Sequence, residues 1–398
     1  MKIFAKTIDD KTKEQLAAIA QVEPFREEKI RIMPDCHSGK GCVVGFTSTI
    51  SNKVIPNVVG VDIGCGVMWD DIGRWDFGAD GLEELDAFIK ERIPSGKNVR
   101  DPENGVFEFI QRLRCKDSLR NLDRICGSLG TLGGGNHFIE VDEDETGCKY
   151  LVVHTGSRDL GKQVAEIYQA KAINDLIESP DKAFVASEIE RLKSEGRQRE
   201  IQPFLERHKA EGAAKPVPED LCWLEGRDME DYLHDMDLCQ EFAHHNRQRI
   251  MDEIFRGFFG FNHDYQFYHY ESIHNYIDII NRVVRKGAIK ADFGQKVIIP
   301  LNMRDGCILG TGLGNPDWNN SAPHGAGRVM SRGEARKELK LSDFQAAMSG
   351  IYTTTAVQGT IDESPMAYKD ASEIIGAIGD TVHVDSLIKP IYNFKAEE

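Results

Sequence analysis

Apolar and polar positions follow two different rhythms along the chain, and these rhythms predict where strands and helices lie. Residues 28–70 and 128–158 alternate short β-branched runs with glycine-rich turns, a pattern typical of strands joined by tight loops. Residues 81–127 and 161–258 instead place apolar side chains at helical spacing among many charges, which predicts helices. Strand and loop patterns return over residues 267–398.

The last part of the chain combines two short predicted helices with a long predicted strand. The helices are expected near residues 333–339 and 371–378, and the segment V-H-V-D-S-L-I-K-P-I-Y-N-F-K is expected to form the last strand. Because helices and strands do not alternate regularly, and no fixed-period repeat is present, the pattern favours an α+β fold. We expect one catalytic domain over residues 1–398, with a helical insertion at about 161–258.

Composition narrows the classes of function. The chain has 398 residues, 40% hydrophobic and 29% charged, so it can build a sizeable core and is not mainly disordered. A net charge of −16 argues against binding nucleic acid by bulk attraction, although it is compatible with a local basic groove. The sequence shows neither the apolar core of a secretory signal nor a segment as long as a membrane span. We therefore expect a soluble, cytoplasmic protein without membrane partners.

Nine cysteines without any C-x-x-C pair argue against a disulfide framework and against a zinc ribbon. Most of them are expected to be small buried side chains. Cys65 differs, because it lies in V-D-I-G-C-G-V, between two glycines and three residues after Asp62. A carboxylate and a thiolate at this spacing can turn toward one cation. The simpler alternative is a glycine turn with a buried cysteine.

Three histidines lie where predicted strands begin or end. His137 follows G-G-G-N and enters a strand, His154 ends the apolar run Y-L-V-V, and His274 lies in E-S-I-H-N-Y. Arg158, four residues after His154, suits bidentate binding of a phosphate. Alone, His274 is more simply a hydrogen-bonded core residue, and the glycine run before His137 is more simply a structural turn. Together with the carboxylate and thiolate of V-D-I-G-C-G-V, the three histidines form a coherent ligand set for one or two ions of Mn, Zn or Fe.

A further histidine, His324, lies in S-A-P-H-G-A-G-R-V-M-S-R, where small residues leave its imidazole accessible. It can serve as a metal ligand, a general base, or a nucleophile that forms a phosphoramidate, and spacing leaves these three open. His37 is a weaker candidate, in a predicted loop with Asp35 and Lys40. G-T-G-L-G-N at 310–315 is interpreted as a turn, and no Walker A loop or nucleophile elbow is present.

In their order along the chain, these motifs resemble those of the RtcB-type RNA-splicing ligases, which join RNA ends using GTP and manganese. The resemblance runs nearly end to end. It rests on M-P-D-C-H-S-G-K-G, V-G-V-D-I-G-C-G-V, L-G-T-L-G-G-G-N-H-F-I-E, H-T-G-S-R, H-N-Y, H-G-A-G-R-V-M-S-R and P-M-A-Y-K-D. It implies the α+β fold of that family, with a central metal cleft.

The resemblance also implies a metal centre with two manganese ions. Cys65 would bridge the two ions. Asp62 and His137 would complete the protein ligands of one ion, and His154 and His274 those of the other.

Further roles implied by the resemblance concern GTP and RNA. His324 matches the histidine that GTP guanylylates, and Asn136 and Arg158 lie where an RNA phosphate end would bind. The guanylate-binding positions that the resemblance implies are Asn136, His137, Phe138, Ile139, Glu140, His274, Asn275, Pro300, Leu301, Asn302, Met303, Cys307, His324, Gly325, Ala326, Gly327, Tyr368 and Lys395. The implied activity joins RNA 3′-phosphate or 2′,3′-cyclic phosphate ends to 5′-hydroxyl ends, through a GMP-histidine and a GMP-activated RNA end. Such a ligase would act in tRNA splicing or RNA repair, with an archease-like protein as a candidate activator.

Two features depart from the family pattern. P-L-N-M-R-D-G at 300–306 stands where the family has P-G-S-M-G, and Ile273 stands where relatives often have a second histidine. The implied metal ligands and His324 are all retained. A metal-dependent phosphoesterase on the same scaffold is the alternative, since it needs the metals and a phosphate site but no nucleophilic histidine. A catalytically inactive RNA-binding protein is disfavoured, because no implied ligand is missing.

Overall fold

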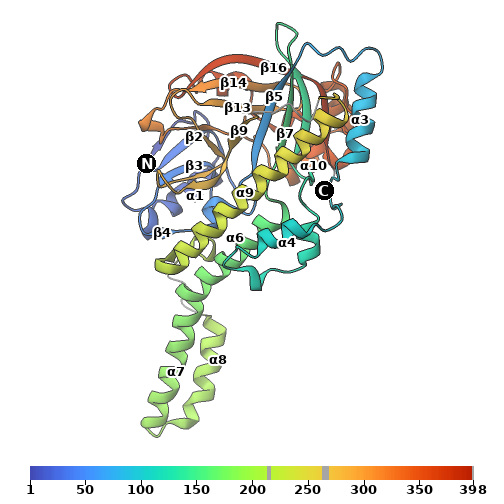
Figure 1. Ribbon diagram of the computed structural model, residues 1–398. Coiled ribbons are helices and arrows are strands. Elements are labelled where there is room, and N and C mark those ends of the chain that lie inside the picture. Colours follow the sequence, from blue (N-terminus) through green and yellow to red (C-terminus); the bar gives the residue numbers. More distant parts are fainter. Residues whose placement is uncertain (213–216, 262–268, 397–398) are drawn as a thin grey trace.

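The computed structural model describes residues 1–212, 217–261 and 269–396 (Figure 1). Within these ranges, helices and strands are interleaved along the chain, which confirms the α+β class. The helices are α1 (Asp10–Ile19), α2 (Pro56–Val59), α3 (Gly81–Arg92), α4 (Asn104–Ile110), α5 (Leu122–Cys126), α6 (Arg158–Ile173), α7 (Ser179–Ser194), α8 (Ile201–Glu211), α9 (Gly226–Gly257), α10 (Arg332–Glu338), α11 (Leu341–Ala347) and α12 (Ala371–Ile375). None of them is long and apolar enough to cross a bilayer.

The larger sheet has seven strands in the described part of the chain, and all its neighbouring pairs are antiparallel. In spatial order they are β13 (Lys296–Asn302), β14 (Gly306–Gly312), β16 (Val382–Lys395), β6 (Phe138–Glu143), β7 (Lys149–Thr155), β5 (Gly66–Gly73) and β9 (Tyr270–Ile273). The two edge strands approach each other, since the backbone N–H of Ile298 on β13 donates to Ser272 Oγ on β9 at 3.1 Å. The sheet is therefore curled almost into a barrel.

Alternation along the strands divides the larger sheet into two apolar faces. On β6, Ile139 and Val141 pack in a cluster with residues of α3 and α9, including Leu85 and Ile254. Phe138 points to the opposite, inner face, where residues from six of the strands pack together. Both clusters favour folding, because buried apolar surface contributes about 25 cal/mol per Å².

The second sheet has five described strands, in the order β1 (Lys2–Ile3), β2 (Arg31–His37), β3 (Val44–Thr49), β11 (Val283–Lys286) and β10 (Asn275–Asp278). Two short pairs complete the strands: β12 (Ala288–Lys290) with β15 (Ser321–Pro323), and β4 (Lys53–Val54) with β8 (Leu224–Glu225). In the seven-stranded and the five-stranded sheet, the strands that bear the motifs are antiparallel. At one rim, the end of one such strand therefore lies beside the start of the next. The motifs at these strand ends consequently gather at one place.

Several expected elements differ from the structure in extent. The last strand is β16 and spans the expected segment, and the helix expected at 333–339 is α10. The helix expected at 371–378 ends at Ile375, because glycine follows it and glycine is a poor helix former. Residues 81–127 contain the separate helices α3, α4 and α5 and the 3₁₀ helix Lys116–Ser118; Pro94 and Pro102, which cannot continue a helix, lie between α3 and α4.

Two loop assignments are wrong. Residues 310–312 are not a turn but the end of β14, where an added Cβ at Gly310 would lie 2.5 Å from Val382 Cγ1. Glycine is needed there so that β14 and β16 can approach. Asp35 and His37 belong to strand β2 and not to a loop.

Within residues 161–258, the helices take two positions. Helices α6 and α9 pack against the body of the molecule, whereas α7 and α8 form a hairpin that projects away from it (Figure 1). A five-residue π-helical segment, Asn174–Glu178, joins α6 to α7.

Candidate active site

The motifs at the strand ends line one cavity of about 350 Å³. One of its walls comes from the larger sheet, including Cys65, Phe138 and His154, and another from β2, β3 and β11 with their loops. His324, which directly follows β15, also lines this cavity. The structure therefore brings the metal-competent residues and the candidate nucleophile to one place.

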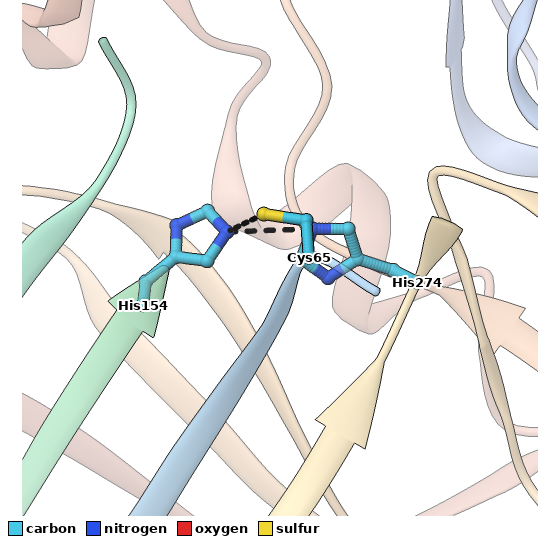
Figure 2. Close-up of side chains that lie close together, drawn as sticks. All are labelled: Cys65, His154 and His274. Carbon is cyan, nitrogen blue, oxygen red and sulfur yellow. Dashed lines mark hydrogen bonds between the residues drawn. The ribbon is translucent and has the colours of Figure 1, made fainter. Parts of the chain in front are cut away.

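Two triads of metal-competent side chains share Cys65. In each triad, the ligand atoms all lie within 4.8 Å of one another. The first triad is Asp62, Cys65 and His137, and the second is Cys65, His154 and His274. Figure 2 shows the second triad, whose side chains come from three different segments and point toward one another. A shared thiolate between two ligand sets is the arrangement that a bridging ligand requires.

Hydrogen bonds orient the imidazoles of the triads. His154 Nδ1–H donates to the carbonyl oxygen of Asn136 at 3.1 Å, which leaves the Nε2 lone pair free. That Nε2 atom lies 3.3 Å from Cys65 Sγ and 3.3 Å from His274 Nε2 (Figure 2). In the other triad, His137 Nε2 lies 3.0 Å from Asp62 Oδ2 and 3.6 Å from Cys65 Sγ. A backbone carbonyl that fixes the histidine tautomer is typical of metal ligands.

The electrostatics of the triads fit a cation. Burial lowers the pKa of His154 and of His274 well below the usual value, so both imidazoles are neutral and can donate a lone pair. Burial and the Asp62 charge raise the pKa of the Cys65 thiol. Burial alone would raise the pKa of Asp62, but the hydrogen bond from His137 holds it well below its usual range. A thiol in this setting ionises only when a cation is bound, so the donor set fits one or two transition-metal ions.

His324 is held by a buried carboxylate. Its Nδ1 lies 2.6 Å from Asp35 Oδ2, so Nδ1–H donates to the carboxylate and the Nε2 lone pair is free. The His324 backbone N–H also contacts this oxygen, at 3.2 Å. Asp35 is fully buried, and the ring of His324 lies 5.0 Å from that of His274, centroid to centroid. An imidazole oriented by a carboxylate, beside a candidate metal site, is arranged as a nucleophile or a base.

Three polar side chains that are linked by hydrogen bonds, Lys395, Glu363 and Tyr368, line one end of the cavity. Lys395 Nζ donates to Glu363 Oε2 at 2.9 Å and to the Asn136 carbonyl at 3.3 Å, and lies 5.3 Å above the Phe138 ring. Tyr368 Oη donates to the same Glu363 oxygen at 2.5 Å. Although burial alone would raise it, the charges of Lys395, Arg332 and Arg328 hold the pKa of Glu363 at about 2. Lys395 is therefore fixed in β16 by defined contacts and is not part of a frayed tail.

Most of the implied nucleotide-binding residues line this cavity, but four implied site residues do not. Ile139 points to the opposite face of β6, and Cys307 is fully buried in the inner apolar cluster. His137 and Arg158 line a second cavity instead. The P-L-N-M segment lines the main cavity, with Leu301 and Met303 buried in apolar clusters, so core packing accommodates the bulkier residues.

The second cavity, of about 270 Å³, lies on the other side of Asp62 and is rich in cationic side chains. Arg158, Arg124 and Lys162 line it, as do Asp62 and Asp159. Arg158 has a left-handed backbone (φ 58°), which is strained for a residue with a Cβ. Its guanidinium packs so closely on Gly133 that an added Cβ there would lie 1.6 Å from Nη2. This local basic cavity exists on a chain whose net charge is −16.

Sequence reasoning missed two supporting residues. Asp35 was noted only as a loop neighbour of His37, and its contact with His324 spans 289 positions along the chain. Arg247 lies on α9, which looked simply amphipathic. Its side chain is fully buried, and Nη1 donates to the carbonyls of Gly64 (2.8 Å) and Thr155 (2.6 Å). It thereby ties together the two loops that flank Cys65 and His154. An arginine within an apolar helical stripe was the signal that could have revealed it.

The model of the family described as tRNA-splicing ligase RtcB matches residues 15–114 and 102–396. The chain belongs to the RtcB family. Among curated proteins, it is similar to the RNA-splicing ligase RtcB of Escherichia coli (strain K12), with 30% identity, covering 95% of this chain and 92% of that protein. The tRNA-splicing ligase RtcB of Methanococcus maripaludis is 26% identical, covering 96% of this chain and 90% of that protein. The RNA-splicing ligase RtcB of Mycobacterium tuberculosis is 25% identical, covering 87% and 91%.

Membership in the RtcB family confirms the resemblance drawn from the motifs, and with it the expected α+β fold. The matched residues include every side chain of the two metal-competent triads, as well as Asp35, His324 and Lys395.

Proposed function

We propose that this protein is an RNA ligase that joins 3′-phosphate or 2′,3′-cyclic phosphate ends to 5′-hydroxyl ends, with GTP as the activating nucleotide. The observation that carries the proposal is the position of His324, which is hydrogen-bonded to Asp35 and lies beside the Cys65, His154 and His274 triad. The printed names of the family relatives, RNA-splicing and tRNA-splicing ligases, support it.

In the proposed first step, His324 Nε2 attacks the α-phosphorus of GTP. A P–N bond forms, the bond from this phosphorus to the bridging oxygen breaks, and pyrophosphate leaves. Asp35 stabilises the imidazolium that develops, because it accepts the hydrogen bond from Nδ1. The RNA 3′-phosphate then takes the GMP from the histidine, and the 5′-hydroxyl oxygen displaces GMP to form the phosphodiester. A 2′,3′-cyclic phosphate would first be hydrolysed to the 3′-phosphate.

Two divalent ions, which we propose to be manganese, would be held by the triads that share Cys65. When bound, they would supply Lewis-acid polarisation of phosphoryl oxygens and neutralise developing charge. The protein's own contribution is orientation: the Asn136 carbonyl fixes the His154 imidazole, and Arg247 fixes the loops beside Cys65. Burial of Cys65, His137, His154 and His274 would limit the access of bulk water to the reacting phosphorus.

We place the guanine base at the end of the cavity that Lys395 closes. The Lys395 ammonium can donate to guanine O6 or N7, whereas adenine presents an amino donor in place of O6. Glu140, which lines the same cavity and faces Lys395, offers an acceptor for the N–H groups of guanine.

We expect Lys395→Ala to weaken GTP binding about ten- to a hundredfold and to narrow the preference for GTP over ATP, because one charged hydrogen bond is lost. Calorimetric titration with each nucleotide measures this. Lys389→Ala, on an exposed part of the same strand, is the matched control and should bind as the parent does. Unchanged affinity and discrimination in Lys395→Ala would remove this residue from the guanine site.

We propose the second cavity as a site for RNA phosphates, because Arg124, Arg158 and Lys162 provide cationic donors there. It lies next to the main cavity, since Val61 and Asp62 line both. An RNA strand that occupies the second cavity would thus bring its end to the metal-competent residues.

We expect the double variant Arg124→Ala, Lys162→Ala to bind RNA more weakly, with a salt dependence reduced by about one to two counterions. Fluorescence anisotropy with an RNA oligomer, over a series of salt concentrations, measures both quantities. Lys182→Ala on the projecting helix α7 is the matched control. Formation of the GMP adduct should be unchanged in the double variant. An unaltered salt slope would place the RNA elsewhere.

The proposed function is tested by incubation with labelled GTP and Mn²⁺, followed by mass mapping of the adduct and by ligation of RNAs with 3′-phosphate and 5′-hydroxyl ends. We expect a GMP adduct on His324 and a sealed RNA. The alternative, a metal-dependent phosphoesterase, would release phosphate from RNA ends without any adduct. A cytoplasmic location, an archease-like activator, and a single catalytic domain with an insertion at about 161–258 stay predictions from the sequence.

A further inference from the structure

Two acidic side chains lie together inside the larger sheet, behind the nucleotide cavity. A carboxylate oxygen of Glu140, one of Asp142 and Cys307 Sγ all lie within 4.8 Å of one another, and all three side chains are buried. Glu140 and Asp142 are two positions apart on β6, so both point to the inner face. Glu140 lines the main cavity, and Asp142 does not.

The surroundings of the two carboxyl groups are unequal. Asn393 Nδ2 donates to Glu140 Oε1, and the nearby Lys395 ammonium stabilises negative charge on Glu140. Asp142 has neither an amide nor an ammonium partner: the thiol of Cys307, a weak donor, lies beside it, and its side chain is fully buried. The residues paired with Asp142 across the neighbouring strands are Pro390 and Tyr150, and the Tyr150 hydroxyl donates to Asp144.

Two like charges at this separation in a buried setting do not both form near neutral pH, as in other buried carboxyl pairs. The titratable groups that face the pair are Cys307 on β14, Lys395 on β16 and, through Lys395, Glu363. Lys395, the positively charged group among them, lies near Glu140 and stabilises its negative charge. One negative charge is therefore stable in the cluster, and its place is Glu140.

We propose that Asp142 stays protonated and thereby keeps the single negative charge of the pair on Glu140, facing the guanine base. Asp142 is then a positioning residue for nucleotide recognition, and this inference rests on the proposed function. The pKa shifts of the two carboxyl groups agree with this assignment. Burial raises the pKa of Glu140 to about 7, and burial together with the Glu140 charge raises the pKa of Asp142 well above its usual value.

The proposal predicts that GTP affinity rises with pH along an acid limb and falls again along an alkaline limb. Affinity should rise as pH passes through about 7, because Glu140 must lose its proton to accept from guanine. It should fall again at higher pH, by up to about tenfold per pH unit, when Asp142 also loses its proton. In Asp142→Asn the second loss cannot occur, so we expect an alkaline fall smaller than that of the parent, limited to the nucleotide's own titration, while the acid limb persists.

Isothermal titration of parent and Asp142→Asn with GTP, without RNA and over a range of pH, tests this. The nucleotide's own titration is the same for both proteins, and Glu143→Gln, next to Asp142 on the same strand, should follow the parent. An alkaline fall of equal size in parent and Asp142→Asn would overturn the proposal.

Infrared difference spectra of the nucleotide-free proteins test the protonation of Asp142 directly. At a pH above the titration of Glu140, we expect the C=O band of a protonated carboxyl group in the parent and its loss in Asp142→Asn. If the parent shows this band but does not bind GTP, the proposed function fails while the neutral Asp142 stands. If the band is absent, or if Asp142→Asn removes one bound equivalent of Zn²⁺ in a metal titration, a proton does not neutralise the cluster and the proposal is wrong.

Discussion

His324→Ala is expected to abolish the GMP adduct and to lower RNA ligation by roughly 10⁴-fold or more, the scale of loss when a covalent nucleophile is removed. The reason is structural: His324 is the imidazole in the main cavity whose Nδ1 is held by the buried Asp35, which frees Nε2 for attack. Mass spectrometry of the protein after incubation with GTP and Mn²⁺ reports the adduct, and gel assays of joined RNA report ligation.

Two controls make the His324 result specific. His383→Ala removes an exposed histidine far from the cavity and should leave adduct and ligation unchanged. Metal titration of His324→Ala should give the same stoichiometry as the parent, because His324 is outside both triads. A GMP adduct that persists in His324→Ala would assign the nucleophile to another residue.

Cys65→Ser is expected to weaken metal binding at both sites by more than about a hundredfold, because Cys65 is the one side chain common to the two triads. A serine hydroxyl is a poor replacement, since it does not ionise at neutral pH and lacks the soft sulfur. Titration with Mn²⁺, and with Co²⁺ to follow the sulfur-to-metal absorption band, measures both affinities. Ligation should be lost in parallel.

His154→Ala provides the comparison for Cys65→Ser. It belongs to one triad only, so it should disturb one equivalent of metal and leave the other nearly intact. If Cys65→Ser retains two equivalents at the affinity of the parent, the bridging role is excluded. If both variants lose both ions together, the two sites are coupled by more than the shared sulfur.

Features that depend on short stretches of sequence could be predicted. The pattern of V-H-V-D-S-L-I-K-P-I-Y-N-F-K predicted β16, and short motifs singled out Cys65 between two glycines and His154 and His274 at strand ends. In an antiparallel sheet, the end of one strand lies beside the start of its neighbour, so residues just before and just after strands meet at the same rim. A plausible ligand set could therefore be assembled from the motifs before any contact between them was known.

Features that depend on distant partners could not be predicted. Asp35 is a strand residue like its neighbours, and only tertiary packing places it against His324. Glu363 lies in the short 3₁₀ helix Gln358–Glu363, with no local pattern to indicate that it holds Lys395. Arg247 was hidden among the charges of α9. In each case the side chain acts on a motif residue from another segment, and sequence spacing carries no signal for such a pair.

The position of β16 has a consequence for how the protein matures during synthesis. This strand joins β14 on one side to β6 on the other, so without it the larger sheet is two separate pieces with exposed edges. The side chains of the two triads that share Cys65 all precede β9 or directly follow it, whereas Lys395 ends β16. As the chain emerges from the ribosome, the proposed metal centre can assemble well before the proposed nucleotide pocket. Long-range pairing of this kind folds slowly and leaves strand edges open to aggregation until it is complete. The chain thus completes its proposed nucleotide pocket in the same step that joins the two parts of the larger sheet.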